Sequence, residues 1–262
     1  MKSTLSLIAL LFLMINCSSD STVNENTNTF SITLAPSATN VVIDQAFTIS
    51  VSATEDIQEM RVSTDNFVTS SYANMQFGTS YVLNFNFDKI GQKSITVRAK
   101  NQNNVVSEKQ IVVNVTRGNA LKILGVQVVS FYGINTVYDP EFPASNPESL
   151  ADLKFGFAKT SLDSFLGNNY VWKNWYRSTV IPNQGSMTWD CSSANLYIDA
   201  ARNFRFGLAE MDNEIAGADL LNGPPDYREI NFSNFVATKP TTITYTFPEI
   251  NLEFKVFVEW AN

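Results

Sequence analysis

The stretch FRFGLAEMDNEIAGADLLNG, residues 204–223, contains carboxylates at a spacing that could bind a cation. It runs from alternating aromatic residues into Glu210, Asp212, Glu214 and Asp219. Calcium takes about six to eight oxygen ligands, and clustered carboxylates on a loop can supply them. Without a cation these groups repel one another unless water or distance offsets their charge. The alternative is that the stretch forms a surface turn without a cation, in which Asp212 and Asp219 only cap the turn and interact with solvent.

Catalytic chemistry has little support in the sequence. The chain contains no histidine, which excludes Ser-His-Asp and Cys-His catalysis and zinc sites built on imidazole. It also lacks a glycine-rich phosphate loop and a nucleophile elbow. Carboxylate pairs such as Asp190 with Asp199, or Glu210 with Asp212, could serve glycoside hydrolysis only if they faced each other across a cleft. We therefore predict that the protein is not an enzyme.

The stretch YVWKNWYRS, residues 170–178, gathers aromatic rings that could contact a partner. Exposed Trp and Tyr rings stack against sugar faces or anchor a protein interface, so Trp172, Trp175 and Tyr176 are candidate contacts. Strand neighbours point to opposite faces, so at least one of the two indoles should point away from the core. The alternative is that these rings fill the core, as aromatic strand residues usually do.

The amino-terminal segment predicts the cellular compartment. Lys2 precedes an apolar run from Leu5 to Ile15 that is too short to span a bilayer and is typical of a secretion signal. The stretch LFLMINCSSD resembles the cleavage box of bacterial lipoproteins, in which the cysteine becomes the lipidated first residue. The resemblance implies a signal peptide over residues 1–16 and a membrane anchor on Cys17, in an outer-membrane lipoprotein of the cell envelope. The alternative is an ordinary signal peptide in which Cys17 is incidental.

The segment that follows Cys17 predicts a flexible tether. Residues 18–29 contain a single apolar residue, Val23, and cannot bury enough surface to order themselves. Cys191 is the only other cysteine, so the mature chain has no pair for an internal disulfide, and Cys191 is most simply a small buried residue. A net charge of -7 without a basic cluster argues against nucleic-acid binding.

The next part of the chain, residues 30–117, is predicted to be a β-sandwich. Its segments AFTISVSA, MRVST, YVLNFNF, KSITVRA and KQIVVNV alternate apolar and polar residues at period two. The stretch FDKIGQKSITVRAKNQNNVVSEKQIVVNV resembles the closing strands of bacterial immunoglobulin-like domains of the polycystic-kidney-disease-repeat (PKD) kind. The resemblance implies a spacer or a binding domain, and the spacer is the simpler interpretation.

A second sandwich is predicted over residues 118–262, after a junction in the stretch VTRGNALK. Its candidate strands are Leu121 to Phe131, Asp152 to Thr160, Val171 to Thr179, Ala194 to Ala200, Phe204 to Met211, Tyr227 to Phe232, Thr241 to Phe247 and Leu252 to Trp260. Eight short strands in this length favour an antiparallel sandwich. The fold class is therefore all-β, with two antiparallel β-sandwich domains in tandem behind the signal peptide and tether.

The order of landmarks in the second sandwich resembles the C-two domain, a calcium- and lipid-binding β-sandwich. LKILGVQVVSFYG leads to an acidic loop with Asp139, then to ADLKFGFAKT, NQGSMTWD, the acidic stretch 204–223 and two closing strands. The resemblance implies calcium ligands at Asp139 and Asp152 in a first loop and at Glu210, Asp212 and Asp219 in a third. Asp139 and Asp152 are separated by PEFPASNPESLA, a longer interval than that family usually has.

These observations combine into one functional prediction. We expect a non-catalytic, lipid-anchored envelope protein in which an immunoglobulin-like domain carries a C-two-like module. That module binds calcium and a partner, which is a glycan, another surface protein or a lipid head group. The rival hypothesis is a purely structural component of the envelope that binds no metal.

Overall fold

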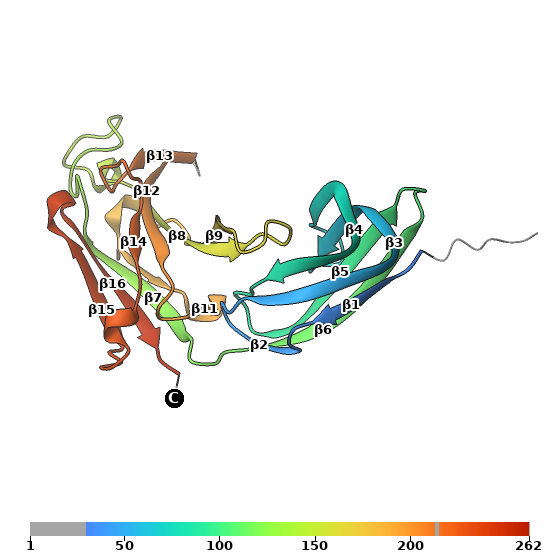
Figure 1. Cartoon of the computed structure of the whole chain (residues 1–262). Coiled ribbons are helices and arrows are strands. Elements are labelled where there is room, and N and C mark those ends of the chain that lie inside the picture. Colours follow the sequence, from blue (N-terminus) through green and yellow to red (C-terminus); the bar gives the residue numbers. More distant parts are fainter. Residues whose placement is uncertain (1–29, 213–214, 262) are drawn as a thin grey trace, which may run out of the picture.

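The computed structural model describes residues 30–212 and 215–261. Within these residues the chain forms sixteen β-strands and five three-residue 3-10 helices, with no α-helix. The predicted all-β class, with two sandwiches in tandem, is confirmed, and Figure 1 shows the two sandwiches side by side. Within this described part, no helix has the length and apolar character needed to cross a membrane. The predicted signal peptide, Cys17 and the tether lie outside the described residues.

The first sandwich is one continuous sheet that folds over on itself. Its strand order is β1-β3-β5-β6-β2, and β4 pairs with β3. The strands are β1 (Ile32–Pro36), β2 (Asn40–Val42), β3 (Phe47–Ser63), β4 (Ser71–Phe85), β5 (Gly91–Asn101) and β6 (Val106–Thr116). One pairing departs from the predicted antiparallel order, because β2 runs parallel to β6.

Strand β3 explains how one sheet encloses a core. Residues 49–53 of β3 pair with β1, and residues 57–63 pair with β5. Between these two parts, the register of β3 with β4 shifts between Ser52 and Ile57. A bulge of this kind bends a strand and increases its twist. The alternate residues Phe47, Ile49 and Val51 are buried, as the period-two pattern predicts.

The second sandwich has two sheets of five strands. One sheet has the order β10-β7-β16-β15 with β11 beside β7, and the other has the order β13-β12-β8-β9 with β14 beside β12. The first sheet comprises β7 (Leu121–Ser130), β10 (Thr188–Asp190), β11 (Leu196–Ile198), β15 (Thr242–Phe247) and β16 (Leu252–Glu259). The second comprises β8 (Leu153–Leu162), β9 (Tyr170–Arg177), β12 (Phe204–Asp212), β13 (Ile215–Asp219) and β14 (Arg228–Ile230).

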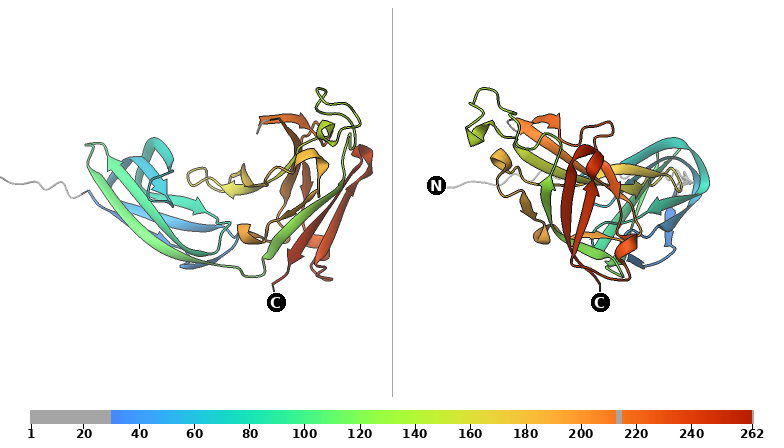
Figure 2. Two further views of the ribbon diagram at one scale, coloured as in Figure 1. Left: turned by 180° about the vertical axis from the view of Figure 1, so that it is seen from behind. Right: turned by 90° about the vertical axis from the view of Figure 1, so that its left-hand side faces the viewer.

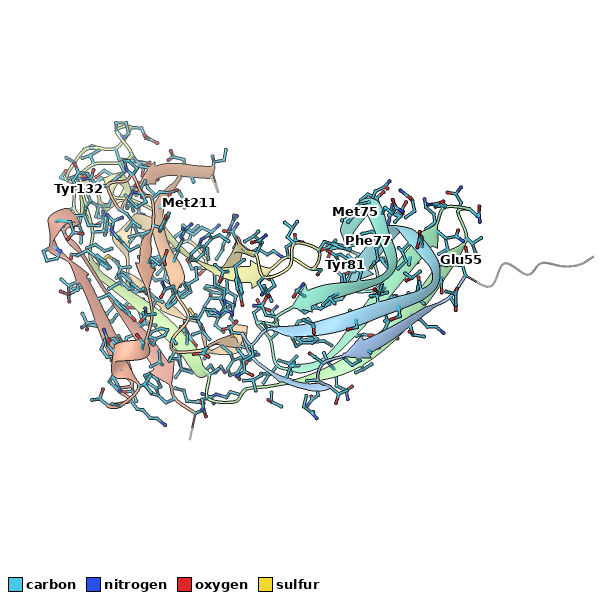
Figure 3. The ribbon with its side chains drawn as sticks, in the orientation of Figure 1. Glu55, Met75, Phe77, Tyr81, Tyr132 and Met211 are labelled. Atoms are coloured by element: carbon cyan, nitrogen blue, oxygen red, sulfur yellow. The ribbon has the colours of Figure 1, made fainter. Side chains whose placement is uncertain are left out.

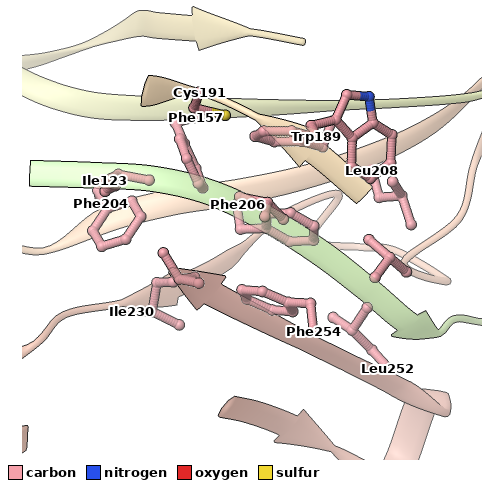
Figure 4. Packing of buried hydrophobic residues seen from close by; sticks show 14 of the residues in the cluster. Ile123, Phe157, Trp189, Cys191, Phe204, Phe206, Leu208, Ile230, Leu252 and Phe254 are labelled. Carbon is pink, nitrogen blue, oxygen red and sulfur yellow. The ribbon is translucent and has the colours of Figure 1, made fainter. Parts of the chain in front are cut away.

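Aromatic side chains fill the space between these two sheets (Figure 4). Phe206 of β12 and Phe254 of β16 stack with ring centroids 4.0 Å apart and so join the two layers directly. Phe155, Phe157 and Phe206 also lie within ring-contact distance of one another. The core therefore supports the start of β8 and the paired end of β12, which lie next to the acidic residues of the candidate site.

The structure differs from the predicted second sandwich in two strands. It contains ten strands here rather than eight, because β10 and β13 were not predicted. The difference matters most for the acidic stretch, which was expected to be a loop leaving the strand that ends near Glu210. Instead, β12 extends to Asp212 and β13 pairs back against it. Cys191 is free and buried, as expected.

The two sandwiches contact each other through several side chains. Tyr81 of β4 donates a hydrogen bond to the backbone oxygen of Phe165, in the loop between β8 and β9. The ring of Phe165 lies 6.1 Å from that of Phe77, and Figure 3 labels Phe77 and Tyr81 on the part of β4 nearest this loop. Tyr197 of β11 packs into the core of the first sandwich. These contacts hold the second sandwich against β4 and the core of the first.

Candidate functional site

The loop after β7 closes on itself and brings distant residues together. The backbone amides of Tyr138 and Asp139 both donate to the carbonyl oxygen of Ser149, at 2.8 and 3.3 Å. Asn146 caps the 3-10 helix η1 (Pro147–Ser149) by accepting a hydrogen bond from the Glu148 amide. The long interval that separates Asp139 from Asp152 in sequence is therefore bridged by backbone hydrogen bonds. Figures 1 and 2 show this loop at the same end of the sandwich as β13.

The β12–β13 hairpin supplies the facing carboxylates. Along β12 the residues Phe204, Phe206, Leu208 and Glu210 are buried in alternation, so Glu210 continues the row that points into the sandwich. The backbone amide of Met211, labelled in Figure 3, donates to the carbonyl oxygen of Asp152 at 2.9 Å. This bond ties the end of β12 to the segment that enters β8.

Three of the predicted ligands meet at this end of the sandwich. One carboxylate oxygen from each of Asp139, Glu210 and Asp212 lies within 4.8 Å of the other two. Two oxygens on opposite sides of a calcium ion, each at about 2.3 to 2.6 Å from it, are about 4.6 to 5.2 Å apart. The spacing in the structure therefore suits a shared calcium ion.

Glu210 is the most unusual of the three. The residue is only 4% exposed, and its Oε1 atom has no hydrogen-bond partner among the described residues. Burial, followed by the charges of Asp212 and Asp139, raises the pKa of Glu210 to about 7, although a hydrogen bond from the Ala218 backbone opposes the shift. Burial also raises the pKa of Asp139, with further contributions from Glu141, Asp212 and Asp152. Each of these causes disfavours negative charge, and a bound cation would offset all of them.

The other predicted ligands occupy different positions. Asp152 borders the same depression as Asp139 and Asp212, and its Oδ1 accepts a hydrogen bond from the Asn183 amide at 2.8 Å. Asp219 does not join the cluster. Its two carboxylate oxygens accept hydrogen bonds from the amides of Leu221 and Gly223, which is the turn-capping role of the alternative interpretation. Glu214 lies outside the described residues.

Two carboxylates at the site were missed from the sequence. Glu141 and Glu148 border the depression together with Asp139, Asp152 and Asp212. Both belong to the interval PEFPASNPESLA, in which no periodicity indicated that its ends meet. The capping pair of Asn146 and Glu148 was the available signal that this segment forms a compact turn.

Gly217 of β13 keeps the site open. A Cβ atom at this position would collide with Oε2 of Glu210 and would lie 3.1 Å from Oδ2 of Asp212. Both carboxylates therefore approach the backbone of β13 at the point where a side chain is absent. A glycine in a strand often marks such a close approach.

The three candidate partner contacts on β9 lie in different surroundings. Trp172 is opposite Thr160, and the Arg205 guanidinium carbon lies 3.7 Å from its ring centroid. Trp175 and Tyr176 are partly buried and both pack against the core. Adjacent strand residues can do so here because the register with β8 shifts at this point. Trp172 is thus the indole that points away from the core.

Comparisons with known proteins assign the chain to no family. No protein-family model matches it, and no curated protein matches its sequence. One similar solved structure is described as the fibronectin(III)-like modules of Clostridium thermocellum CbhA, with a TM-score of 0.27, 10% identity and coverage of 76% of this chain and 93% of that one. Another is described as carbohydrate-binding modules of the β-sandwich superfamily, with a TM-score of 0.27, 8% identity and coverage of 89% and 98%.

Proposed function

We propose that the protein is a non-catalytic, lipid-anchored component of the bacterial cell envelope whose second sandwich binds calcium. The ion would be held by Asp139, Glu210 and Asp212, with Asp152 as a further ligand. The observation that carries this proposal is the buried Oε1 atom of Glu210, which has no hydrogen-bond partner among the described residues and belongs to a cluster with two other carboxylates. A buried polar atom without a partner is costly, and an ion at this position would satisfy it.

The donor set favours calcium over other metals. All the candidate ligands are oxygens, and neither histidine nor cysteine is among them, whereas zinc prefers nitrogen and sulfur. Magnesium requires near-ideal octahedral geometry at about 2.1 Å and seldom binds in an all-protein cage. Calcium accepts irregular geometry and completes its shell with backbone oxygens and water. These are also the residues, apart from Asp219, that the C-two resemblance implies.

The surroundings of the site suit binding without large rearrangement. The loop that carries Asp139 is closed by hydrogen bonds to Ser149, and Asp152 is oriented by the amide of Asn183. Glu210 is fixed at the end of the core row on β12. Ligands that are already oriented lose less conformational entropy when an ion binds.

The proposed location rests on the amino-terminal segment. A lipidated Cys17 would attach the chain to the membrane, and the polar residues after it would act as a tether. The immunoglobulin-like first sandwich would then hold the calcium-binding module away from the membrane.

Thermal unfolding of the chain in calcium and in chelator tests this proposal. A ligand at about 100 times its Kd stabilises the folded state by about 2.7 kcal/mol, so calcium should raise the Tm of the wild type. The increase should disappear in Glu210→Gln and in Asp212→Asn. It should persist in Glu249→Gln, an exposed carboxylate of the 3-10 helix η5 (Pro248–Ile250) that belongs neither to the carboxylate cluster nor to the lining of the depression. If the wild type has the same Tm in calcium and in chelator, the calcium proposal is wrong. The rival hypothesis, a structural envelope component that binds no metal, would then hold.

A further inference from the structure

A second feature of the same sandwich is a groove on the outer face of the sheet that contains β8 and β12. Its volume is about 470 Å³. The floor includes Gly156 of β8 and Gly207 of β12, which are direct cross-strand partners. Because neither residue has a side chain, the backbone itself forms the floor at this point. The groove lies on the opposite side of the sheet from the aromatic core.

The floor restricts which ligands the groove can hold. Strands β8 and β12 are central in their sheet and each pairs with neighbours on both sides, so a peptide cannot bind there by adding a strand. The outward residues beside the glycines, Ala158 and Ala209, are small and form no deep apolar pocket for a peptide anchor. A small ring that rests one of its faces on backbone atoms fits this floor better than an extended peptide.

The walls carry polar side chains that are available for a ligand. Lys154 and Arg177 lie on the β8–β9 side, where Arg177 is the cross-strand neighbour of Gly156. Asn174 and Asp226 also line the groove. None of these four side chains forms a hydrogen bond or ion pair with another residue in the described part of the chain. Asp219 also lines the groove, and its carboxylate already accepts hydrogen bonds from two backbone amides. The two unpaired cations lie together on the β8–β9 side, and that side of the groove favours an anionic group of a ligand.

We propose that this groove binds an acidic oligosaccharide that contains uronate residues. The carboxylate of a uronate pairs with Lys154 and Arg177, the latter in the two-point geometry that guanidinium groups form with carboxylates. The sugar hydroxyls donate to Asp226 and exchange hydrogen bonds with Asn174, while the ring lies over Gly156 and Gly207. This inference goes beyond the proposed calcium binding, because it assigns a separate groove of the same sandwich to a class of partner.

Isothermal titration with defined oligosaccharides tests the inference. The probes are oligomers of galacturonate, of mannuronate and guluronate, and of hyaluronan, each compared with its carboxyl-reduced, neutral counterpart of equal length. Titration in chelator prevents calcium from cross-linking the uronates. We expect at least one uronate oligomer to bind, and its neutral counterpart to bind at least about tenfold more weakly. If no uronate oligomer binds, or if the neutral forms bind equally well, the inference is wrong.

Matched variants assign any binding to the groove. The double variant Lys154→Ala with Arg177→Ala should reduce affinity at least about tenfold, since each charged contact contributes more than about 1 kcal/mol. Gly207→Ala should obstruct the floor with a methyl group, and it should fold because a Cβ there would lie 3.5 Å from the Asp226 carbonyl oxygen, an ordinary contact. The control is Lys93→Ala with Lys109→Ala in the first sandwich, which should bind as the wild type does.

The outcomes separate this inference from the calcium proposal. Unchanged binding in both groove variants would place the glycan elsewhere and overturn the inference. Binding of a phosphorylated peptide in the groove, without any uronate oligomer, would also overturn it. The calcium-dependent rise in Tm is measured on the same preparation, so its persistence without glycan binding would remove only the groove inference.

Discussion

The ammonium nitrogen of Lys159 in the second sandwich lies 2.8 Å from Oδ1 of Asp44 in the first, and both side chains are almost fully buried. Asp44 also accepts a hydrogen bond from the backbone amide of Asp199 through Oδ2, and its carbonyl oxygen accepts one from Arg202. Burial lowers the pKa of Lys159, and the adjacent Asp44 carboxylate opposes that shift. The pair therefore joins the two sandwiches at a point where neither charge has access to solvent.

Loss of one member of this pair should be costly. Asp44→Ala leaves the Lys159 ammonium buried without its counterion, which typically destabilises a protein by about 3 to 5 kcal/mol. Urea unfolding should report this loss, and small-angle scattering should show a wider range of orientations between the sandwiches. Glu108→Ala, which removes an exposed pair with Arg98, is the control and should cost at most about 1 kcal/mol. Similar losses in the two variants would mean that the buried pair does not fix the interface.

A methyl group at Gly217 should weaken calcium binding. In Gly217→Ala the new Cβ collides with Oε2 of Glu210 and forces that carboxylate out of the cluster. We expect the calcium affinity to fall at least about tenfold, which corresponds to about 1.4 kcal/mol. Gly207→Ala is the matched control, because its Cβ meets no atom closer than 3.5 Å and it lies on the opposite face of β12 from Glu210. Calcium titration of both variants measures the difference, and equal affinities would contradict the proposed ligand role of Glu210.

The stability of the calcium-free protein should depend on the titration of Glu210. Its pKa is about 7 in the folded chain and near 4.5 when unperturbed, so between these values the folded state retains a proton that the unfolded state has released. Stability should therefore fall as the pH rises from 4.5 to 7, by at most about 3 kcal/mol. Urea unfolding in chelator measures this slope.

Two comparisons identify the group responsible for the slope. Glu210→Gln should largely remove it, because the variant side chain carries no charge at any pH, whereas Glu249→Gln should retain it. Calcium should also flatten the slope, since the cation favours the ionised form. A slope that is the same in Glu210→Gln and the wild type would show that another group causes it.

The sequence predicted those parts of the fold in which local pattern decides the structure. Alternation of large apolar residues was sufficient for strands such as β12, where Phe204, Phe206 and Leu208 fill one face. Strand β13 was missed because the sequence IAGAD has no such alternation, and its pairing depends on the hairpin partner. The pattern of β8 also contained an overlooked signal, since Lys159 occupies the inward position after Phe155 and Phe157.

The candidate site was predictable only in part, for a similar reason. The proximity of Glu210 and Asp212 follows from their position on one strand end. The approach of Asp139 depends on backbone hydrogen bonds across the loop to Ser149, which no periodicity in the sequence reports. Asp219 seemed equivalent to Asp212 in sequence, but its carboxylate is occupied by two backbone amides.

Direct titration of the chelator-treated protein with calcium is the measurement that tests the central proposal. One calcium ion should bind per chain, with the stoichiometry retained in Glu249→Gln and lost or strongly weakened in Glu210→Gln. If the wild type takes up no calcium at millimolar concentration, or if Glu210→Gln binds as tightly as the wild type, the cluster of Asp139, Glu210 and Asp212 is not a calcium site.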